Sequence, residues 1–355
     1  MISASLLIAG KDLTLLLRDR MALFWVVAFP LGFALFFGSV MKAGVDAESA
    51  PLSIVLVLDS SQPEAAAIAR ELERSGLQTR RGTRAQAVTA VRLGEAVAFV
   101  RIRDDQASPI ELGVDPSRRS ESALLLGVVK TALAPDAQAQ LPRIDTTEVM
   151  RADSGSHSGY EIVLPAMLMW GLLGCAATFA VSLVSERSSG TLLRLRAAPI
   201  SRASILGGKS LACAIACMID VLLLSLLARL AFDVRIEDPA KYLATLFACT
   251  VCFTGLTMVL CTLGKTEQAV SGAGWATLIV FAMIGGAMVP LSVMPSWLLE
   301  LSNVSPVKWG IWALEGATWR DLAWHELLRP LALLVAFGVT CFVAGLSILI
   351  AWREL

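Results

Sequence analysis

Histidine is almost absent from this sequence, and charge is scarce. The 355 residues include two histidines, His157 and His325, and only 17% of the residues are charged whereas 56% are hydrophobic. Two histidines are too few to favour a histidine-based metal site. The fraction of charged residues is lower than in an ordinary soluble domain. The balance of 30 basic and 30 acidic residues points to no particular partner. The composition is that of a membrane protein with several spans.

Cysteine is missing from the one long polar segment, residues 44–158. All seven cysteines fall inside apolar runs: Cys175, Cys213, Cys217, Cys249, Cys252, Cys261 and Cys341. A disulfide framework is therefore excluded in the polar segment, even if that segment faces an oxidising compartment. Cys249 and Cys252 form a CxxC pair, which we interpret as small-residue packing in a lipid-embedded helix rather than a metal or redox site.

Motifs for catalysis and nucleotide binding are also missing. The sequence "GGKS" at 207–210 resembles the end of a phosphate-binding loop, but Ala203 stands where that loop needs glycine, and no strand precedes it. The stretch "HELLR" at 325–329 lacks the second histidine of a zinc-protease motif. We therefore expect no enzyme activity in this chain and no cofactor or metal bound to it.

Six long apolar runs are present instead. Each approaches the length of about 20 residues that a helix needs to cross a bilayer. The runs are Ala22 to Met41, Ile162 to Val184, Ser210 to Ala228, Leu243 to Leu263, Gln268 to Val289 and Leu331 to Ala351. The first lacks the basic tip and cleavage site of a signal peptide, so we interpret it as a permanent span. The expected fold is a polytopic α-helical membrane protein with six transmembrane helices, one at 22–41 and five within 162–351.

Lysine and arginine in the short connections favour one orientation. Ten of them lie on the side of the two termini and seven on the opposite side. Because basic residues concentrate in cytoplasmic loops, and six spans return the chain to its starting side, both termini are expected in the cytoplasm. We thus predict a multi-pass protein of the bacterial inner (plasma) membrane with residues 44–158 outside.

Residues 44–158 alternate strand-like and helix-like stretches, which predicts an inserted extracytoplasmic α/β domain. Its basic and acidic residues nearly balance, so it carries no one-signed field for nucleic acid. Strands are predicted at Leu52–Asp59, Ala96–Arg103 and Pro109–Asp115, and helices from Ser61 to Arg74 and from Glu121 to Ala134. Gating, docking of an outside partner and shaping of an exit route all remain open as its role.

Residues 1–21 repeat leucine and isoleucine at helical spacing, with charged residues in between. This pattern predicts an amphipathic interfacial helix in the cytoplasmic headgroup region, ahead of the first span. The alternative is a longer first span with a ragged end.

The connection 185–209 is short and basic, and three explanations compete for it. The first is an anchor that follows the positive-inside rule, and the second is a phosphate-binding loop, which the missing glycine and strand exclude. The third is a helical lever that takes force from a soluble partner. As a lever, Glu186 and Arg187 would pair with neighbouring charges and with charges on the partner. Gly190 would allow close backbone approach, the leucines after it would offer an apolar face, and Pro199 would stop the helix.

The stretch "SERSSGTLLRLRAAPIS" resembles the cytoplasmic signature of the type-2 ATP-binding-cassette permeases (ABC type 2 exporters). The matching positions are Glu186, Arg187, Gly190, Thr191, Leu192, Leu195 and Pro199. The same family is also resembled in three further features: Pro30 in the first span, the large domain after that span, and the number of six spans. The resemblance implies a transmembrane subunit that works in pairs, with ATPase subunits, which bind ATP and Mg, docked on residues 1–21 and 185–209.

Five of the nine tryptophans lie between Val289 and Leu328. Tryptophan is enriched at the membrane–water interface, and prolines cut this stretch into apolar pieces too short to span. We predict two short re-entrant or interfacial helices, an outer hairpin over 290–325 marked by Pro295, Trp297, Pro306 and Trp309. The resemblance implies such a hairpin near the point where substrate leaves, and an ordinary exterior loop is the alternative.

Asp220 lies near the middle of the third predicted span. A carboxylate at that depth costs a few kcal/mol, so such residues usually face the bundle or a wet cavity and take part in function. The alternative is a protonated carboxyl that forms a hydrogen bond with Thr254 or Thr257 of the fourth span.

Together these features predict the permease subunit of an ATP-driven ABC exporter, which moves substrate outward through a dimeric path. The expected partners are an ABC ATPase subunit, a second permease copy or homologue, and membrane lipid, without nucleic acid. A membrane sensor or receptor with a ligand-binding exterior domain and a secondary transporter are the alternatives. Six spans exceed what a simple sensor needs, and secondary transporters more often show internal repeats and several intramembrane charges.

Overall fold

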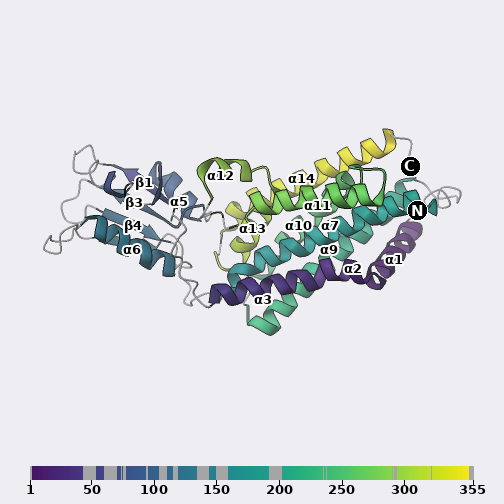
Figure 1. Ribbon diagram of the computed structural model, residues 1–355, viewed down its shortest axis with the longest axis horizontal. Coiled ribbons are helices and arrows are strands. Elements are labelled where there is room, and N and C mark those ends of the chain that lie inside the picture. Colours follow the sequence, from purple (N-terminus) through teal and green to yellow (C-terminus); the bar gives the residue numbers. More distant parts are fainter. Residues whose placement is uncertain are drawn as a thin grey trace. The chain divides into compact units, whose positions relative to one another are not determined.

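The computed structural model describes two compact units of the chain (Figure 1). The described residues are 2–42, 53–59, 70–72, 74, 77–92, 95–103, 110–114, 119–133, 144–148, 159–191, 202–234, 236, 238–289, 291, 294–320 and 322–351. The helical unit comprises residues 1–43, 158–288 and 302–355, and the sheet unit comprises residues 44–157 and 289–301.

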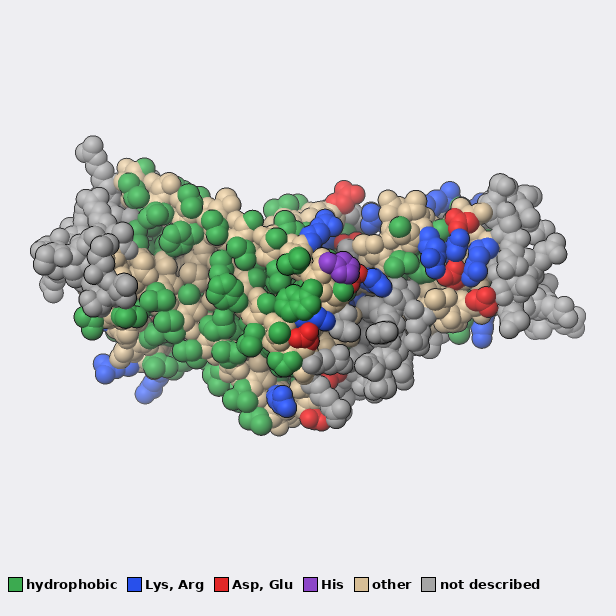
Figure 2. All heavy atoms as spheres, turned by 180° about the vertical axis from the view of Figure 1, so that it is seen from behind, with side chains coloured by type: hydrophobic (Ala, Val, Ile, Leu, Met, Phe, Trp, Pro, Cys, Tyr) green, Lys and Arg blue, Asp and Glu red, His purple; other side chains and the backbone are tan. Residues whose placement is uncertain are grey.

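Within the described residues, the helical unit has six helices that are long and apolar enough to cross a membrane. They cover Arg20–Ser39, Tyr160–Ser188, Ser204–Phe232, Pro239–Leu260, Glu267–Ile284 and Trp324–Ala351. Each overlaps one predicted span, with ends that differ by up to seven residues, so the predicted class of polytopic helical protein is confirmed. Figure 2 shows many hydrophobic and few charged side chains spread over the visible face of this unit, as expected for a surface that meets lipid.

The two central helices of the helical unit are α7 and α10. The apolar stretches of α7 and α10 are 83% and 72% buried, whereas those of α11 and α14 are only 28% and 22% buried. The elements are α1 (Ile2–Arg18), α2 (Arg20–Leu23), the π-helix η1 (Phe24–Ala28), α3 (Phe29–Lys42), α7 (Gly159–Ser188), α9 (Arg202–Phe232), α10 (Pro239–Leu260), α11 (Glu267–Ile284), α13 (Pro306–Thr318) and α14 (Trp324–Ala351).

Aspartate side chains begin two of these helices. Asp19 accepts hydrogen bonds from the backbone N–H groups of Met21 and Ala22 at 2.9 and 3.1 Å, so α2 starts afresh after α1 has ended. Asp238 begins α10 in the same way, and the backbone N–H groups of Lys241 and Ala240 hold the pKa of Asp238 below its ordinary value. The structure thus gives residues 2–18 a helix separate from the first span.

The sheet unit contains a five-stranded mixed sheet of order β2-β1-β3-β4-β5. Strands β1 and β2, β1 and β3, and β4 and β5 pair in parallel, whereas β3 and β4 are antiparallel. Buried side chains of α6 cover one face of the sheet and those of α5 cover the other. The elements are β1 (Ser53–Leu58), β2 (Gln78–Arg81), α5 (Arg84–Arg92), β3 (Ala98–Ile102), β4 (Ile110–Val114), α6 (Arg119–Leu133), β5 (Ile144–Glu148) and α12 (Ser296–Ser302).

The three predicted strands coincide with β1, β3 and β4, and the second predicted helix coincides with α6. The first predicted helix, from Ser61 to Arg74, is described only at residues 70–72 and 74, which are helical, and the rest lies outside the described residues. Elements β2, α5 and β5 were not predicted. Charged side chains are frequent in this unit, and three arginines, Arg84, Arg101 and Arg103, pair with the buried Glu111 of β4.

Candidate functional site

Helix α1 packs directly on the first turns of α9. The Ser5 hydroxyl donates a hydrogen bond to the Ser204 carbonyl at 3.0 Å, and Ile8 is buried. A Cβ atom at Gly208 would lie 2.9 Å from both the Ile8 Cβ and the Ser5 carbonyl oxygen. Only glycine therefore allows the two helices to approach this closely, and the contact fixes α1 to the bundle.

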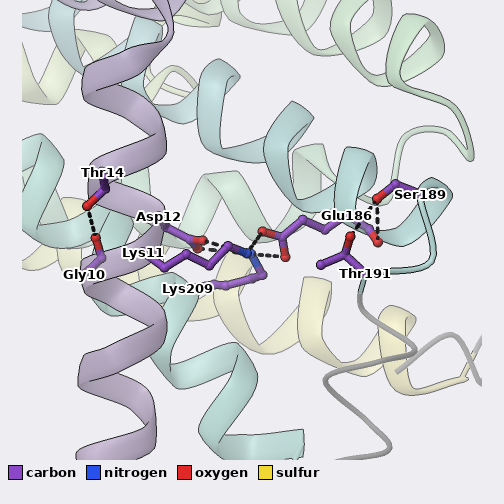
Figure 3. Close-up of polar contacts among 8 residues, drawn as sticks. All are labelled: Gly10, Lys11, Asp12, Thr14, Glu186, Ser189, Thr191 and Lys209. Atoms are coloured by element: carbon purple, nitrogen blue, oxygen red, sulfur yellow. Dashed lines mark hydrogen bonds and ion pairs between the residues drawn. The ribbon is translucent and has the colours of Figure 1, made fainter.

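Four charged side chains join α1, α7 and α9, as Figure 3 shows. Lys209 Nζ lies 3.0 Å from Asp12 Oδ2 and 2.6 Å from Glu186 Oε2. Lys11 Nζ lies 2.5 Å from Glu186 Oε1 and 3.7 Å from Asp12 Oδ1. We call these four residues the four-charge cluster. Each helix contributes at least one member, so the cluster ties three separate elements together.

Most of the four-charge cluster is shielded from water. The side chains of Asp12, Lys209 and Glu186 are 3%, 5% and 10% exposed, and that of Lys11 is 41% exposed. Two ammonium groups and two carboxylates cancel in charge. Removing one member of a buried ion pair costs about 3–5 kcal/mol because its partner is left uncompensated. The cluster therefore strongly favours one arrangement of the three helices.

Sequence reasoning found Glu186 but missed its partners within the chain. Glu186 was expected to pair with neighbouring charges and with those of another protein, and the structure places its carboxylate among the charges of α1 and α9. Lys11 and Asp12 were among the charged residues of the predicted interfacial helix 1–21, and Lys209 was the last residue of the connection 185–209, but the sequence did not show that they meet Glu186. The signal was present, because Lys209 opens an apolar run, where a lysine needs a carboxylate partner.

The chain leaves α7 through a glycine. Gly190 has φ 74°, the left-handed conformation that ends many helices, and the hydroxyls of Ser189 and Thr191 lie 3.1 Å apart. Within the described residues, no atom approaches the position of a Gly190 Cβ within 4 Å, and the close approach of a docked partner at this glycine stays a prediction. Arg187 is half-buried in the last turn of α7. The other predicted positions of this signature, Leu192, Leu195 and Pro199, lie outside the described residues.

Asp220 is buried at the contact between α9 and α7, with 2% exposure. A Cβ atom on Gly171 of α7 would lie 2.3 Å from Asp220 Oδ2, so the carboxyl group sits against this glycine. Neither carboxyl oxygen has a hydrogen-bond partner among the described residues, and the Thr257 hydroxyl donates to the Phe253 carbonyl. The hydrogen bond from Asp220 to Thr254 or Thr257, which was the alternative explanation of this residue, is therefore not formed among the described residues.

Two short helices, α12 and α13, occupy the region of the predicted hairpin. Pro295 directly precedes the 7-residue α12, and Pro306 is the first residue of the 13-residue α13. Trp297 is exposed, whereas the Trp309 Nε1–H donates to the Asn303 carbonyl at 2.9 Å. Neither helix is long enough to span a bilayer. Their position at the outer side stays a prediction.

Comparisons with known proteins agree on one family. The family described as "ABC-2 family transporter protein" matches residues 20–347. The linearmycin resistance permease protein LnrN of Bacillus subtilis is 27% identical over 201 residues, 56% of this chain and 50% of that protein. The probable multidrug ABC transporter permease YbhR of Escherichia coli is 24% identical over 211 residues, 57% of each chain. The match thus spans about half the length of each of these relatives.

Proposed function

Because the chain belongs to the ABC-2 family of transporter proteins, we propose that it is the membrane-spanning permease of an ATP-driven exporter. A separate cytoplasmic ATPase binds ATP and Mg and supplies the energy. A second permease copy or a homologue completes a dimeric path through the membrane. The name of one relative refers to linearmycin resistance and that of the other to multidrug transport, which supports outward movement of a harmful compound.

We place both termini of the chain in the cytoplasm and the sheet unit outside the cell. Helix α1 then lies along the cytoplasmic membrane surface. Four of its leucines are 46–76% exposed although they are large and apolar: Leu6, Leu7, Leu15 and Leu17. Such a face suits the boundary between headgroups and acyl chains. On the opposite side, α12 and α13 form the hairpin beside the exit.

The ATPase docks on α1 and on the connection that follows α7. When nucleotide closes the paired ATPases, they move these two docking elements. The four-charge cluster supports this mechanism because it links α1 to the end of α7 and to the start of α9. A displacement of either docking element is then transmitted to two spans at once. This cluster is the observation that carries the proposed mechanism.

Docking is tested on the leucines of the connection. We expect Leu192→Asp combined with Leu195→Asp to remove a co-expressed ABC ATPase from the purified permease, because a carboxylate is costly to bury in an apolar groove. The control is Lys265→Glu, which adds negative charge at an exposed residue between α10 and α11. The permease itself should unfold at an unchanged temperature. If the ATPase stays bound to the leucine variant, the docking role of this connection is refuted.

A further inference from the structure

A cavity of about 450 Å³ lies between α1, α2, η1, α7 and α11. Asp12 and Glu186 of the four-charge cluster are part of its wall. Pockets that bind small molecules usually enclose about 300–1,000 Å³, so this one is large enough for a drug-sized ligand. The proposed function uses the ion pairs beside the cavity and assigns nothing to the cavity itself.

Polar side chains on two spans face this cavity. Helix α11 contributes Glu267, Ser271 and Trp275, which recur every four residues and so share one face of the helix. Helix α7 contributes Thr178, Ser182 and Ser185, which are spaced by four and three residues and so also share one face. Lipid does not solvate such groups, and their common direction in otherwise apolar helices indicates a wet cavity.

Two indole rings form part of the wall. Trp25 of η1 and Trp275 of α11 have ring centroids 4.7 Å apart and planes inclined by 48°. The faces of indole rings carry negative electrostatic potential and attract organic cations within about 6 Å. Leu15 and Phe179 add apolar surface beside them. The wall thus suits an apolar ligand that bears a positive charge.

Among the residues that the structure describes, the charged groups in the cavity lining have one sign. They are Asp12, Asp19, Glu186 and Glu267, with no lysine or arginine in that part of the wall. Lys11 and Lys209 neutralise Asp12 and Glu186 from outside the lining. Among the residues that the structure describes, Asp19 and Glu267 have no ion-pair partner, and Asp19 is already engaged in the cap of α2. Glu267, which accepts one long hydrogen bond from the Ser188 hydroxyl at 3.5 Å, is left to balance a ligand charge.

We propose that this cavity is a binding site for a hydrophobic organic cation with a single positive charge, such as a quaternary ammonium or phosphonium compound. The proposal rests on the proposed exporter function and assigns it a substrate class. Glu267 supplies the opposite charge, Trp25 and Trp275 contact the apolar groups around the cation, and the hydroxyls of α7 hold the remaining water. A bound anion would meet the same carboxylates and be repelled.

Binding is measured on the full-length permease with its ATPase, reconstituted in lipid nanodiscs. Tetraphenylphosphonium is titrated against tryptophan fluorescence, with empty nanodiscs subtracted. Triphenylphosphine oxide and tetraphenylborate serve as neutral and anionic probes of similar shape. We expect saturable binding of the cation, and binding of the anion that is weaker by about tenfold or more, because the fixed charges change from attractive to repulsive.

Variants then locate the bound cation. Glu267→Gln should weaken its binding about fivefold, and Trp275→Leu should do the same, whereas Trp275→Phe should recover part of the affinity because it retains an aromatic face. The matched control is Glu71→Gln, which removes an exposed carboxylate from the sheet unit and should leave binding unchanged.

Three results would overturn this inference. The first is equal binding of cation and anion. The second is no cation binding by a complex that still couples ATP hydrolysis to export of another compound, which would leave the exporter function intact. The third is a Glu267→Gln variant that loses the ATPase but binds the cation as before, since the cavity would then be a partner surface.

Discussion

At the scale of the residue, the four-charge cluster depends on one ammonium group, that of Lys209. Lys209 reaches Asp12 on α1 and Glu186 on α7 from α9, so a single side chain connects three helices. It is 5% exposed, and no water can replace its two carboxylate partners without opening the contact. Lys11 has the same two partners but is 41% exposed, so its pairs contribute less.

Lys209→Met should therefore destabilise the helical unit by about 3 kcal/mol, since it leaves Asp12 and Glu186 buried with only the half-exposed Lys11 between them. Thermal unfolding of the purified permease in nanodiscs measures this change. The control is Lys265→Met, which removes an exposed lysine outside the cluster and should leave the unfolding temperature unchanged. Equal shifts of the unfolding temperature for both variants would mean that the cluster contributes no more to stability than an exposed lysine does.

Asp220→Asn tests whether the buried carboxyl group takes part in transport. Asparagine has nearly the same shape and keeps the contact with Gly171, but it cannot be ionised. We expect export to fall several-fold while the amount of assembled permease–ATPase complex is unchanged, because buried carboxylates in membrane helices usually serve function. Transport in inside-out vesicles and co-purification measure the two quantities. Export at the level of the unsubstituted protein would make Asp220 a packing residue.

At the scale of the element, two neighbouring glycines of α9 have opposite surroundings. Gly208 faces Ile8 and the Ser5 carbonyl of α1 at distances that exclude a methyl group, whereas no atom lies within 4 Å of a Cβ on Gly207 among the described residues. Their identical chemistry and adjacent positions make each the control of the other. The contact between α1 and α9 can thus be tested by one methyl group.

Gly208→Ala should destabilise the helical unit by about 1–3 kcal/mol, because α1 must move away from α9. Gly207→Ala should instead be neutral or stabilise by up to about 1 kcal/mol, since alanine has a higher helix propensity than glycine at an exposed position. Thermal unfolding gives both values, and limited proteolysis within residues 2–18 reports release of α1. Similar behaviour of the two variants would contradict the close packing of α1 on α9.

Elements with strong apolar patterns could be predicted from the sequence, and the others could not. Strand β1 is the buried run "SIVLVL", whereas the edge strand β2 is "QTRR", whose polar side chains are half-exposed or exposed. The helix α5 buries only small residues and one valine, so its pattern is weak. The position of the spans followed from length and hydropathy. The partners of Glu186 lie 175 and 23 residues away, and only folding brings them together.

At the scale of the whole molecule, the proposed exporter must convert a push on its cytoplasmic end into movement of its spans. Among the described residues, helix α1 packs mainly on α9, and the connection after α7 begins four residues beyond Glu186 at Gly190. The four-charge cluster joins α1 to the end of α7 and to the start of α9, next to both of the proposed docking elements. Coupling therefore requires the ion pairs of the cluster to stay intact while the ATPases move the proposed docking elements, and not only in the resting protein.

Glu186→Gln separates coupling from assembly. It removes the charged link from α7 to Lys209 and Lys11, so ATP hydrolysis by the bound ATPase should continue while export per ATP falls several-fold. The variant also leaves one excess positive charge, which by itself destabilises the bundle. Adding Lys11→Met restores neutrality, because Lys209 and Asp12 still pair at 3.0 Å, and should recover most of the lost stability. Export per ATP should stay low in this double variant, since the charged link to α7 is still missing. Recovery of export together with stability would show that the cluster only stabilises the fold and does not transmit force.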